Sequence, residues 1–119
     1  MYEVYVMHIR ALMTECAIEM ARSMTSKGSP WRSISQVDFH FGRARIAFDH
    51  IAEKQLFESI ESVRICLQQA NDVCLYIFSE NKDDQYCPWF RHLWKCAELL
   101  HKMIFDIDEI ICRERSMMP

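Results

Sequence analysis

A carboxylate and an imidazole lie one helical turn apart near the C-terminal end of the sequence. Glu98 and His101 have the i, i+3 spacing with which helical bundles hold paired iron or manganese ions. Such a site needs the motif twice, whereas the pair His50 and Glu53 runs in the reverse order. We therefore expect His101 to hydrogen-bond Glu98 beside an apolar face, and we expect no metal ion and no other cofactor.

Cys87 is the cysteine best placed for nucleophilic chemistry. Pro88 follows it and is typical of the first turn of a helix, whose N-terminus favours a thiolate. The candidate base, His92, is five residues further on, so a helix would turn it to another side. The chain also has only two glycines and lacks the motifs of a nucleophile elbow or a phosphate-binding loop. We expect Cys87 to be an ordinary thiol.

Arg45 and His50 have an Arg-x4-His spacing. Residues 45–50, RIAFDH, resemble the motif of HEPN-type helical ribonucleases over these six positions. The resemblance implies that the arginine and the histidine act together on an RNA phosphodiester. Five residues along a helix separate two side chains by about 140°, so both groups would reach one phosphate only in a dimer. An HEPN-like ribonuclease that uses Arg45 and His50 in a dimer is therefore the alternative function.

The composition indicates one compact domain over residues 1–119. Of the 119 residues 50% are hydrophobic and 12% aromatic, which is enough for a domain with its own core. Fourteen basic and 17 acidic residues give a net charge of -3. Such a chain has no overall positive field, so neither nucleic acid nor an anionic membrane surface is the expected partner.

The cysteines and the N-terminal residues bear on the compartment. The sequence lacks CxxC pairs, which favours reduced core thiols over a disulfide framework or a zinc site. The first residues lack the basic and apolar regions of an export signal, and no segment has the roughly 18 apolar residues of a membrane span. We expect a cytoplasmic protein with six free thiols, at Cys16, Cys66, Cys74, Cys87, Cys96 and Cys112.

Three segments place apolar residues at the three- and four-residue steps of a helix. They are residues 3–24, 55–79 and 88–114, and polar breaks at 25–30 and 81–85 separate them from their neighbours. Short connections of this kind join antiparallel helices. The three series are Val6, Ile9, Met13, Cys16, Met20 and Met24; Leu56, Ile60, Val63, Leu67, Ala70, Cys74 and Ile77; and Phe90, Leu93, Ala97, Leu100, Ile104, Ile107 and Ile111.

Residues 33–52 fit two structures. Val37, Phe41, Ala44, Phe48 and Ile51 have helical spacing, and this series is out of phase with the Leu56 series, which predicts a break near residues 53–55. The same segment also alternates, so a β-hairpin over about residues 34–48, packed on three helices, is the alternative. We favour the helix. The predicted fold is therefore all-α, an up-and-down four-helix bundle.

Large apolar residues also occur away from the predicted core positions. If the Leu56 series faces the core, Ile65 and Tyr76 lie on the opposite side of that helix. If the Val37 series faces the core, Phe39 and Ile46 also point outward, and two tryptophans lie beside the loops. Two outward ridges of this kind suggest a buried contact with another molecule. The candidate partner-binding residues are Ile65, Tyr76, Phe39, Ile46, Trp89 and Trp31.

These features favour a non-enzymatic function. We expect a small cytoplasmic interaction protein that binds a protein partner or a second copy of itself as a homodimer. An adaptor, an inhibitor or an immunity-like factor would have this form, of the kind that phages and mobile elements encode. The HEPN-like ribonuclease remains the alternative, and it differs in requiring Arg45 and His50 for RNA cleavage.

Overall fold

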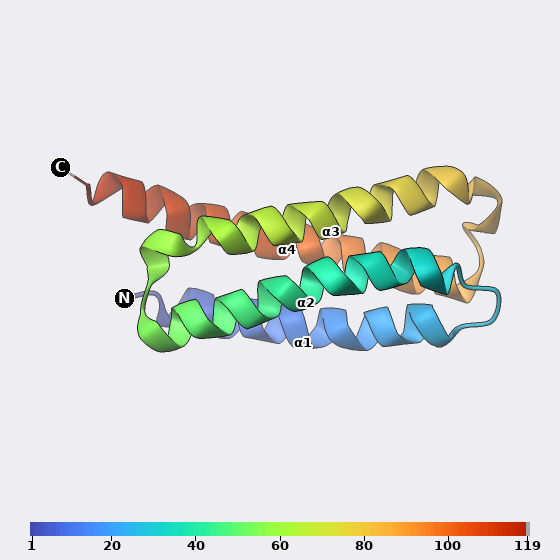
Figure 1. The fold of residues 1–119 in the computed structure, drawn as a ribbon, viewed down its shortest axis with the longest axis horizontal. Coiled ribbons are helices and arrows are strands. Elements are labelled where there is room, and N and C mark those ends of the chain that lie inside the picture. Colours follow the sequence, from blue (N-terminus) through green and yellow to red (C-terminus); the bar gives the residue numbers. More distant parts are fainter. Residues whose placement is uncertain (119) are drawn as a thin grey trace.

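The protein is an all-α, up-and-down four-helix bundle. A computed structural model describes residues 1–118, and within them no strand occurs (Figure 1). The β-hairpin alternative for residues 34–48 is therefore wrong. The elements in chain order are α1 (Glu3–Thr25), α2 (Trp31–Lys54), the 3-10 turn η1 (Phe57–Ser59), α3 (Glu61–Glu80), the 3-10 turn η2 (Lys82–Asp84) and α4 (Pro88–Ser116).

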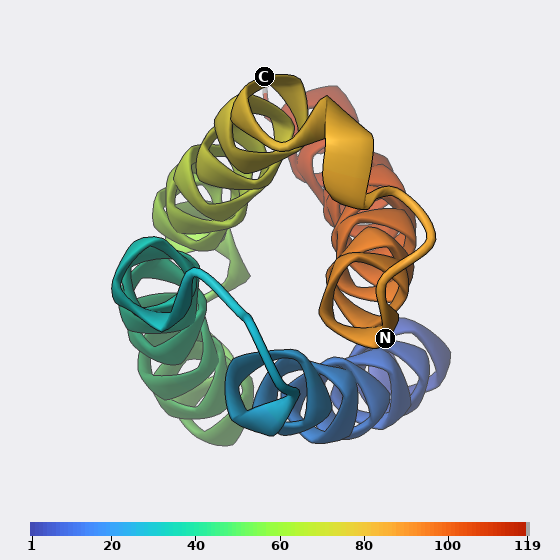
Figure 2. The same ribbon diagram turned by 90° about the vertical axis from the view of Figure 1, so that its right-hand side faces the viewer.

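The four helices occupy the corners of a square. Figure 2 shows them end-on, with α1 beside α2 and α4, and with α3 beside α2 and α4. Each short connection reverses the chain, so both termini lie at the same end of an elongated molecule that measures 51 × 22 × 19 Å (Figure 1). None of the four helices, over the residues described, combines the length and the apolar composition that a membrane-spanning helix requires.

The helix boundaries follow from local chemistry. Gly28, between α1 and α2, has φ +77, a left-handed conformation that glycine adopts without steric cost. Gln55 ends α2 in the same region of φ, which confirms the break predicted near residues 53–55. Pro88 opens α4, as expected for a residue whose missing N–H is not needed there. The prediction that Leu56 begins the core series of α3 is wrong. Leu56 precedes η1 and is 37% exposed.

Each helix buries one apolar face in a common core. In α2 the buried positions include Val37, Phe41, Ala44, Phe48 and Ile51, which is the predicted series. In α3 they include Val63, Leu67, Ala70, Cys74 and Ile77. These faces fix which side of each helix points outward, and therefore which side chains remain accessible.

Candidate interaction surfaces

The outer face of α3 carries both predicted ridge residues. Ile65 is 53% exposed and Tyr76 is 65% exposed. They are separated by eleven residues, which is close to three helical turns, so they lie on one side of the helix. The opposite side contributes Leu67 and Ala70 to the core, where both are fully buried. The predicted orientation of this helix is confirmed, and its ridge is open to solvent.

The outer face of α2 combines apolar and cationic groups. Phe39 and Ile46 are both exposed and lie one heptad apart. The guanidinium of Arg43 lies 5.8 Å from the centroid of the Phe39 ring, close enough for a cation–π contact. Because α2 packs beside α3, the two outward ridges occupy neighbouring corners of the bundle (Figure 2).

The two loop-side tryptophans have different environments. Trp31 begins α2 and is exposed, with the guanidinium of Arg32 5.2 Å from its ring centroid. Trp89 is only 1% exposed, so its assignment to a partner-binding surface is corrected: it is a core residue. Trp89 is the second residue of α4, and its side chain points into the bundle. Its ring meets that of Phe90 edge-on, with the ring centroids 5.5 Å apart. Its backbone carbonyl accepts a hydrogen bond from the Ser23 hydroxyl at 2.8 Å.

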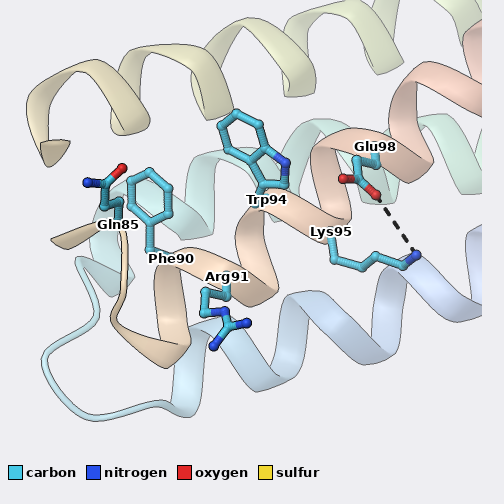
Figure 3. Close-up of a pocket in the computed structure, with 6 residues that line it drawn as sticks. All are labelled: Gln85, Phe90, Arg91, Trp94, Lys95 and Glu98. Atoms are coloured by element: carbon cyan, nitrogen blue, oxygen red, sulfur yellow. Dashed lines mark ion pairs between the residues drawn. The ribbon is translucent and has the colours of Figure 1, made fainter.

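A shallow pocket of about 370 Å³ lies on α4 where the loop from α3 arrives. Figure 3 shows Trp94 and Phe90 on one side of the pocket, with Trp94 extending toward α3, and Arg91 and Lys95 on the other. The rings of Phe90 and Trp94 are nearly parallel with centroids 6.2 Å apart, and Glu98 pairs with Lys95 at 3.9 Å. The half-exposed indole of Trp94 could therefore serve as an anchor for a partner's apolar side chain.

Trp94 was missed by the sequence reasoning, as were several exposed residues of the other helices. The available signal was position: Trp94 directly follows the core residue Leu93 and falls off the predicted series of α4. Phe105, also exposed, lies eleven residues further along the same side of α4. On α1 the exposed apolar residues are Val4, Met7 and Ile18.

Arg45 and His50 are both exposed on α2. The guanidinium of Arg45 lies over the ring of Phe41 at 5.6 Å, and the helix turns His50 about 140° away from it. Within one copy of the chain the two groups therefore point in different directions. Their use in an RNA cleavage site would still need a second copy.

The other polar pairs of the sequence are separated in space or bound elsewhere. Glu98 pairs with Lys95, as described, and not with the exposed His101. Cys87 is half-buried at the start of α4, whereas His92 binds Glu19 of α1 through its Nδ1 at 2.7 Å. Over residues 1–118, no three His, Cys, Asp or Glu side chains gather as metal ligands.

Two of the buried cysteines, Cys74 and Cys96, have thiols whose pKa is strongly raised. Cys16 and Cys96 face each other across α1 and α4, with each sulfur directed at the other residue's carbonyl oxygen. Burial raises the pKa of the Cys74 thiol far above its ordinary value, and the contact with Cys16 together with burial does the same to the pKa of Cys96. A thiol held in its protonated form is a poor nucleophile, so Cys74 and Cys96 serve packing.

Comparison with known proteins does not indicate a function, so the exposed surfaces described above are the remaining basis for one. No protein-family model matches the chain, and neither curated proteins nor solved structures gave a significant match.

Proposed function

We propose that the protein is a small, non-enzymatic interaction protein, such as an adaptor, inhibitor or immunity-like factor, that binds another protein. The observation that carries this proposal is the exposure of Ile65 and Tyr76 on α3, opposite a fully packed core face. The neighbouring ridge of Phe39 and Ile46 on α2 extends the same side of the bundle. The six free cysteines support action in the reducing environment of the cytoplasm.

The energetics favour a contact of this kind. Moving one large apolar side chain from water into an interface contributes about 1.5–3 kcal/mol. Binding energy also concentrates in aromatic and arginine side chains, and the α2 and α3 ridges offer Tyr76, Phe39 and Arg43. A few such residues around Ile65 are enough to anchor a partner.

The decisive experiment replaces Ile65 by aspartate in the full chain. Ile65→Asp should leave helicity and the melting temperature nearly unchanged, because an exposed position contributes little to folding. It should abolish capture of the partner, since a buried unpaired carboxylate is costly. Phe105→Asp is the matched control, because it also replaces a large exposed apolar side chain by aspartate but lies on α4 and not on the α3 ridge.

The readout is affinity capture with the wild-type chain and both variants, followed by direct titration of the captured protein. A specific partner is lost with Ile65→Asp and retained with Phe105→Asp. If Ile65→Asp and wild type bind the same protein equally, the α3 ridge is idle surface and the proposal fails. Metal-independent RNA cleavage that His50→Ala abolishes would instead establish the ribonuclease.

A further inference from the structure

α1 has a second ordered face on the side away from the core. Its residues recur at alternating steps of three and four, which is the a/d spacing of a coiled coil. Val4 is 79% exposed, Met7 72% and Ile18 48%, and the smaller members are also exposed. We call this set the outer stripe of α1; it comprises Val4, Met7, Ala11, Thr14, Ile18, Ala21 and Thr25.

The outer stripe differs from the outer faces of the other helices because it contains no charged residue over its whole length. The ridge of α2 includes Arg43, that of α3 includes Asp72, and that of α4 includes Glu98. The charged residues of α1 lie instead on the two flanks of the stripe. Glu3 and Arg10 occupy the flank next to α2, and His8, Glu15 and Arg22 occupy the flank next to α4.

We propose that the outer stripe of α1 is the interface with a second copy of this chain, in which the two α1 helices pair side by side, parallel and in register. The stripe runs for about 33 Å, or three heptads, which is a contact length typical of helix pairs. Its small members Ala11, Thr14 and Ala21 allow close approach, and Val4, Met7 and Ile18 supply the apolar area.

The flanking charges match this arrangement. In a parallel pair each residue that precedes an a position faces the residue five places later in the partner helix. Arg10 then faces Glu15 of the other copy, and the two-fold axis repeats this pair, so opposite charges meet on both sides. Within one copy Arg10 reaches only Asp49 at 3.8 Å, and Glu15 reaches only Lys95 at 4.0 Å. Such long exposed pairs contribute little, so both side chains are free to change partners.

The neighbouring helices favour the same orientation. In a parallel pair the two-fold axis is parallel to α1. The exposed flank of α2 next to α1 then lies on the same side of the dimer as the exposed flank of α4 next to α1 in the other copy. The α1-side flank of α2 is mainly acidic, with Asp38, Asp49 and Glu53 beside Arg45. The corresponding flank of α4 carries four basic residues, Arg91, Lys95, Lys102 and Arg113, together with Glu109 and with Glu98, which pairs with Lys95. An antiparallel pair would instead set acidic against acidic and basic against basic.

These opposite charges also lie at matching heights along the bundle. Asp49 is beside Arg10, and Lys102 is one turn from Asp106, which is beside His8. Three turns further along, Asp38 comes level with Arg91, the neighbour of His92, which contacts Glu19. The flanks therefore present opposite charges at the same height, an attraction that favours the parallel pair most strongly at low salt.

The first test measures the mass of the full chain in solution as a function of concentration. The wild type should pass from monomer to dimer between about 1 and 500 µM. Ala11→Glu should raise the dissociation constant at least about tenfold without loss of helicity, because it places two carboxylates at the centre of the interface. Ile65→Asp should leave the dimer intact, which separates this inference from the proposed function on α3. A wild type that stays monomeric, or a dimer that tolerates Ala11→Glu, overturns it.

The second test exchanges charges across the interface. Arg10→Glu alone and Glu15→Arg alone should each weaken the dimer about threefold to tenfold at low salt, because like charges then face each other. The double variant Arg10→Glu/Glu15→Arg should restore the wild-type affinity. If the double variant is as weak as the sum of the single variants, Arg10 and Glu15 do not meet and the register is wrong.

The third test distinguishes the two orientations. In a parallel pair Ala21 lies opposite Ala21 of the other copy, whereas an antiparallel pair aligned along the stripe separates them by about 20 Å along the helix axis. Ala21→Cys, in a background of Cys87→Ser and Cys112→Ser, should therefore form an intermolecular disulfide under mild oxidation. The background without Ala21→Cys is the control. A dimer that fails to cross-link at this position overturns the parallel arrangement.

Discussion

The two long helix contacts of the bundle, α1 with α4 and α2 with α3, are built differently. Tyr2, Ser23 and two histidine–carboxylate pairs join α1 to α4 by hydrogen bonds, in addition to apolar packing. Over residues 1–118 no side-chain hydrogen bond or ion pair joins α2 to α3, which pack mainly through apolar side chains. The two buried polar atoms without a partner in that range, His40 Nδ1 and Asn71 Oδ1, belong to α2 and α3.

The two contacts therefore contribute differently to the fold. Apolar packing stabilises the fold but does not by itself select one alignment of two helices. Directional contacts such as Ser23 Oγ to the Trp89 carbonyl, at 2.8 Å, are made only in one alignment. The α1–α4 contact therefore sets the register of the first and last helices, and it also carries the groups that respond to pH. The α2–α3 contact should respond most strongly to changes in side-chain volume.

The largest expected effect is a cavity on the core face of α2. Phe48 is fully buried in α2, and Phe48→Ala should lower the free energy of unfolding by about 3–5 kcal/mol, because it removes the transfer gain and leaves a void. Urea unfolding followed by circular dichroism measures the change. Phe39→Ala, on the exposed side of the same helix, is the control and should stay within about 0.5 kcal/mol of the wild type. Equal losses for both variants would contradict the orientation of α2.

A smaller effect is expected at the end of the α1–α4 contact. The side chain of Tyr2 is buried and its partly buried hydroxyl donates a hydrogen bond to the Glu114 carboxylate at 2.8 Å, so Tyr2→Phe should cost about 1.5–3 kcal/mol at neutral pH. Burial, with the hydrogen bond and charge of Glu114, raises the pKa of Tyr2 from 10.0 to about 12.

The raised pKa of Tyr2 gives the variant an alkaline signature. A raised pKa in the folded state means that the stabilisation is complete below pH 10.0 and is lost as the pH rises through about 12. The wild type should therefore lose its advantage over Tyr2→Phe in that range, measured by urea unfolding at several pH values. An advantage that is constant up to pH 12 would show that the hydroxyl does not titrate as described.

The helices and the core could be predicted from the sequence because apolar spacing is a local property. The series from Val37 to Ile51 and from Val63 to Ile77 need only the period of one helix. Leu56 and Trp89 were misplaced because each lies at a helix end, where the path of the chain, and not the period, decides the direction of a side chain.

The surfaces were only partly predictable for a related reason. Ile65 and Tyr76 could be placed because one unbroken core series fixed the opposite side of α3. The pairs of His92 with Glu19 and of His8 with Asp106 join residues 73 and 98 positions apart, and their meeting depends on the register between α1 and α4. No local pattern contains that register. The outer stripe of α1 is visible in the sequence, but four of its seven members are Ala or Thr, so larger residues hide its period.

The third prediction is that removing a buried polar group destabilises the α1–α4 contact but not the α2–α3 contact. Ser23→Ala removes the buried hydrogen bond to Trp89 and should destabilise by about 1 kcal/mol. Asn71→Leu removes a buried amide whose oxygen has no partner and keeps the shape of the side chain, so it should be neutral or stabilise by up to about 1 kcal/mol. Thermal and urea unfolding of both variants measure the difference, and a clear loss for Asn71→Leu would mean that its oxygen is satisfied in solution.

The smallest change at neutral pH is expected for His92→Gln, where the amide can still hydrogen-bond Glu19 but carries no charge. Burial acts to raise the pKa of Glu19, but the hydrogen bond and charge of His92, with Arg22 at 3.0 Å, outweigh it and hold the pKa below 4.5. A lowered pKa in the folded state contributes stability that is present above the unfolded value and is lost as the pH falls through the folded value. At pH 7 the variant should therefore differ by a few tenths of a kcal/mol, as is usual for a partly exposed pair.

The difference should grow in acid. Without the charge of His92, burial is opposed only by Arg22 and the amide, so the pKa of Glu19 rises and the protein begins to lose stability at a higher pH than the wild type. Acid unfolding followed by circular dichroism should show the midpoint of His92→Gln displaced upward, whereas Asn71→Leu should leave the midpoint in place or move it down. If His92→Gln and the wild type unfold at the same pH, Glu19 draws its stabilisation from Arg22 alone, and the acid response does not belong to the α1–α4 contact.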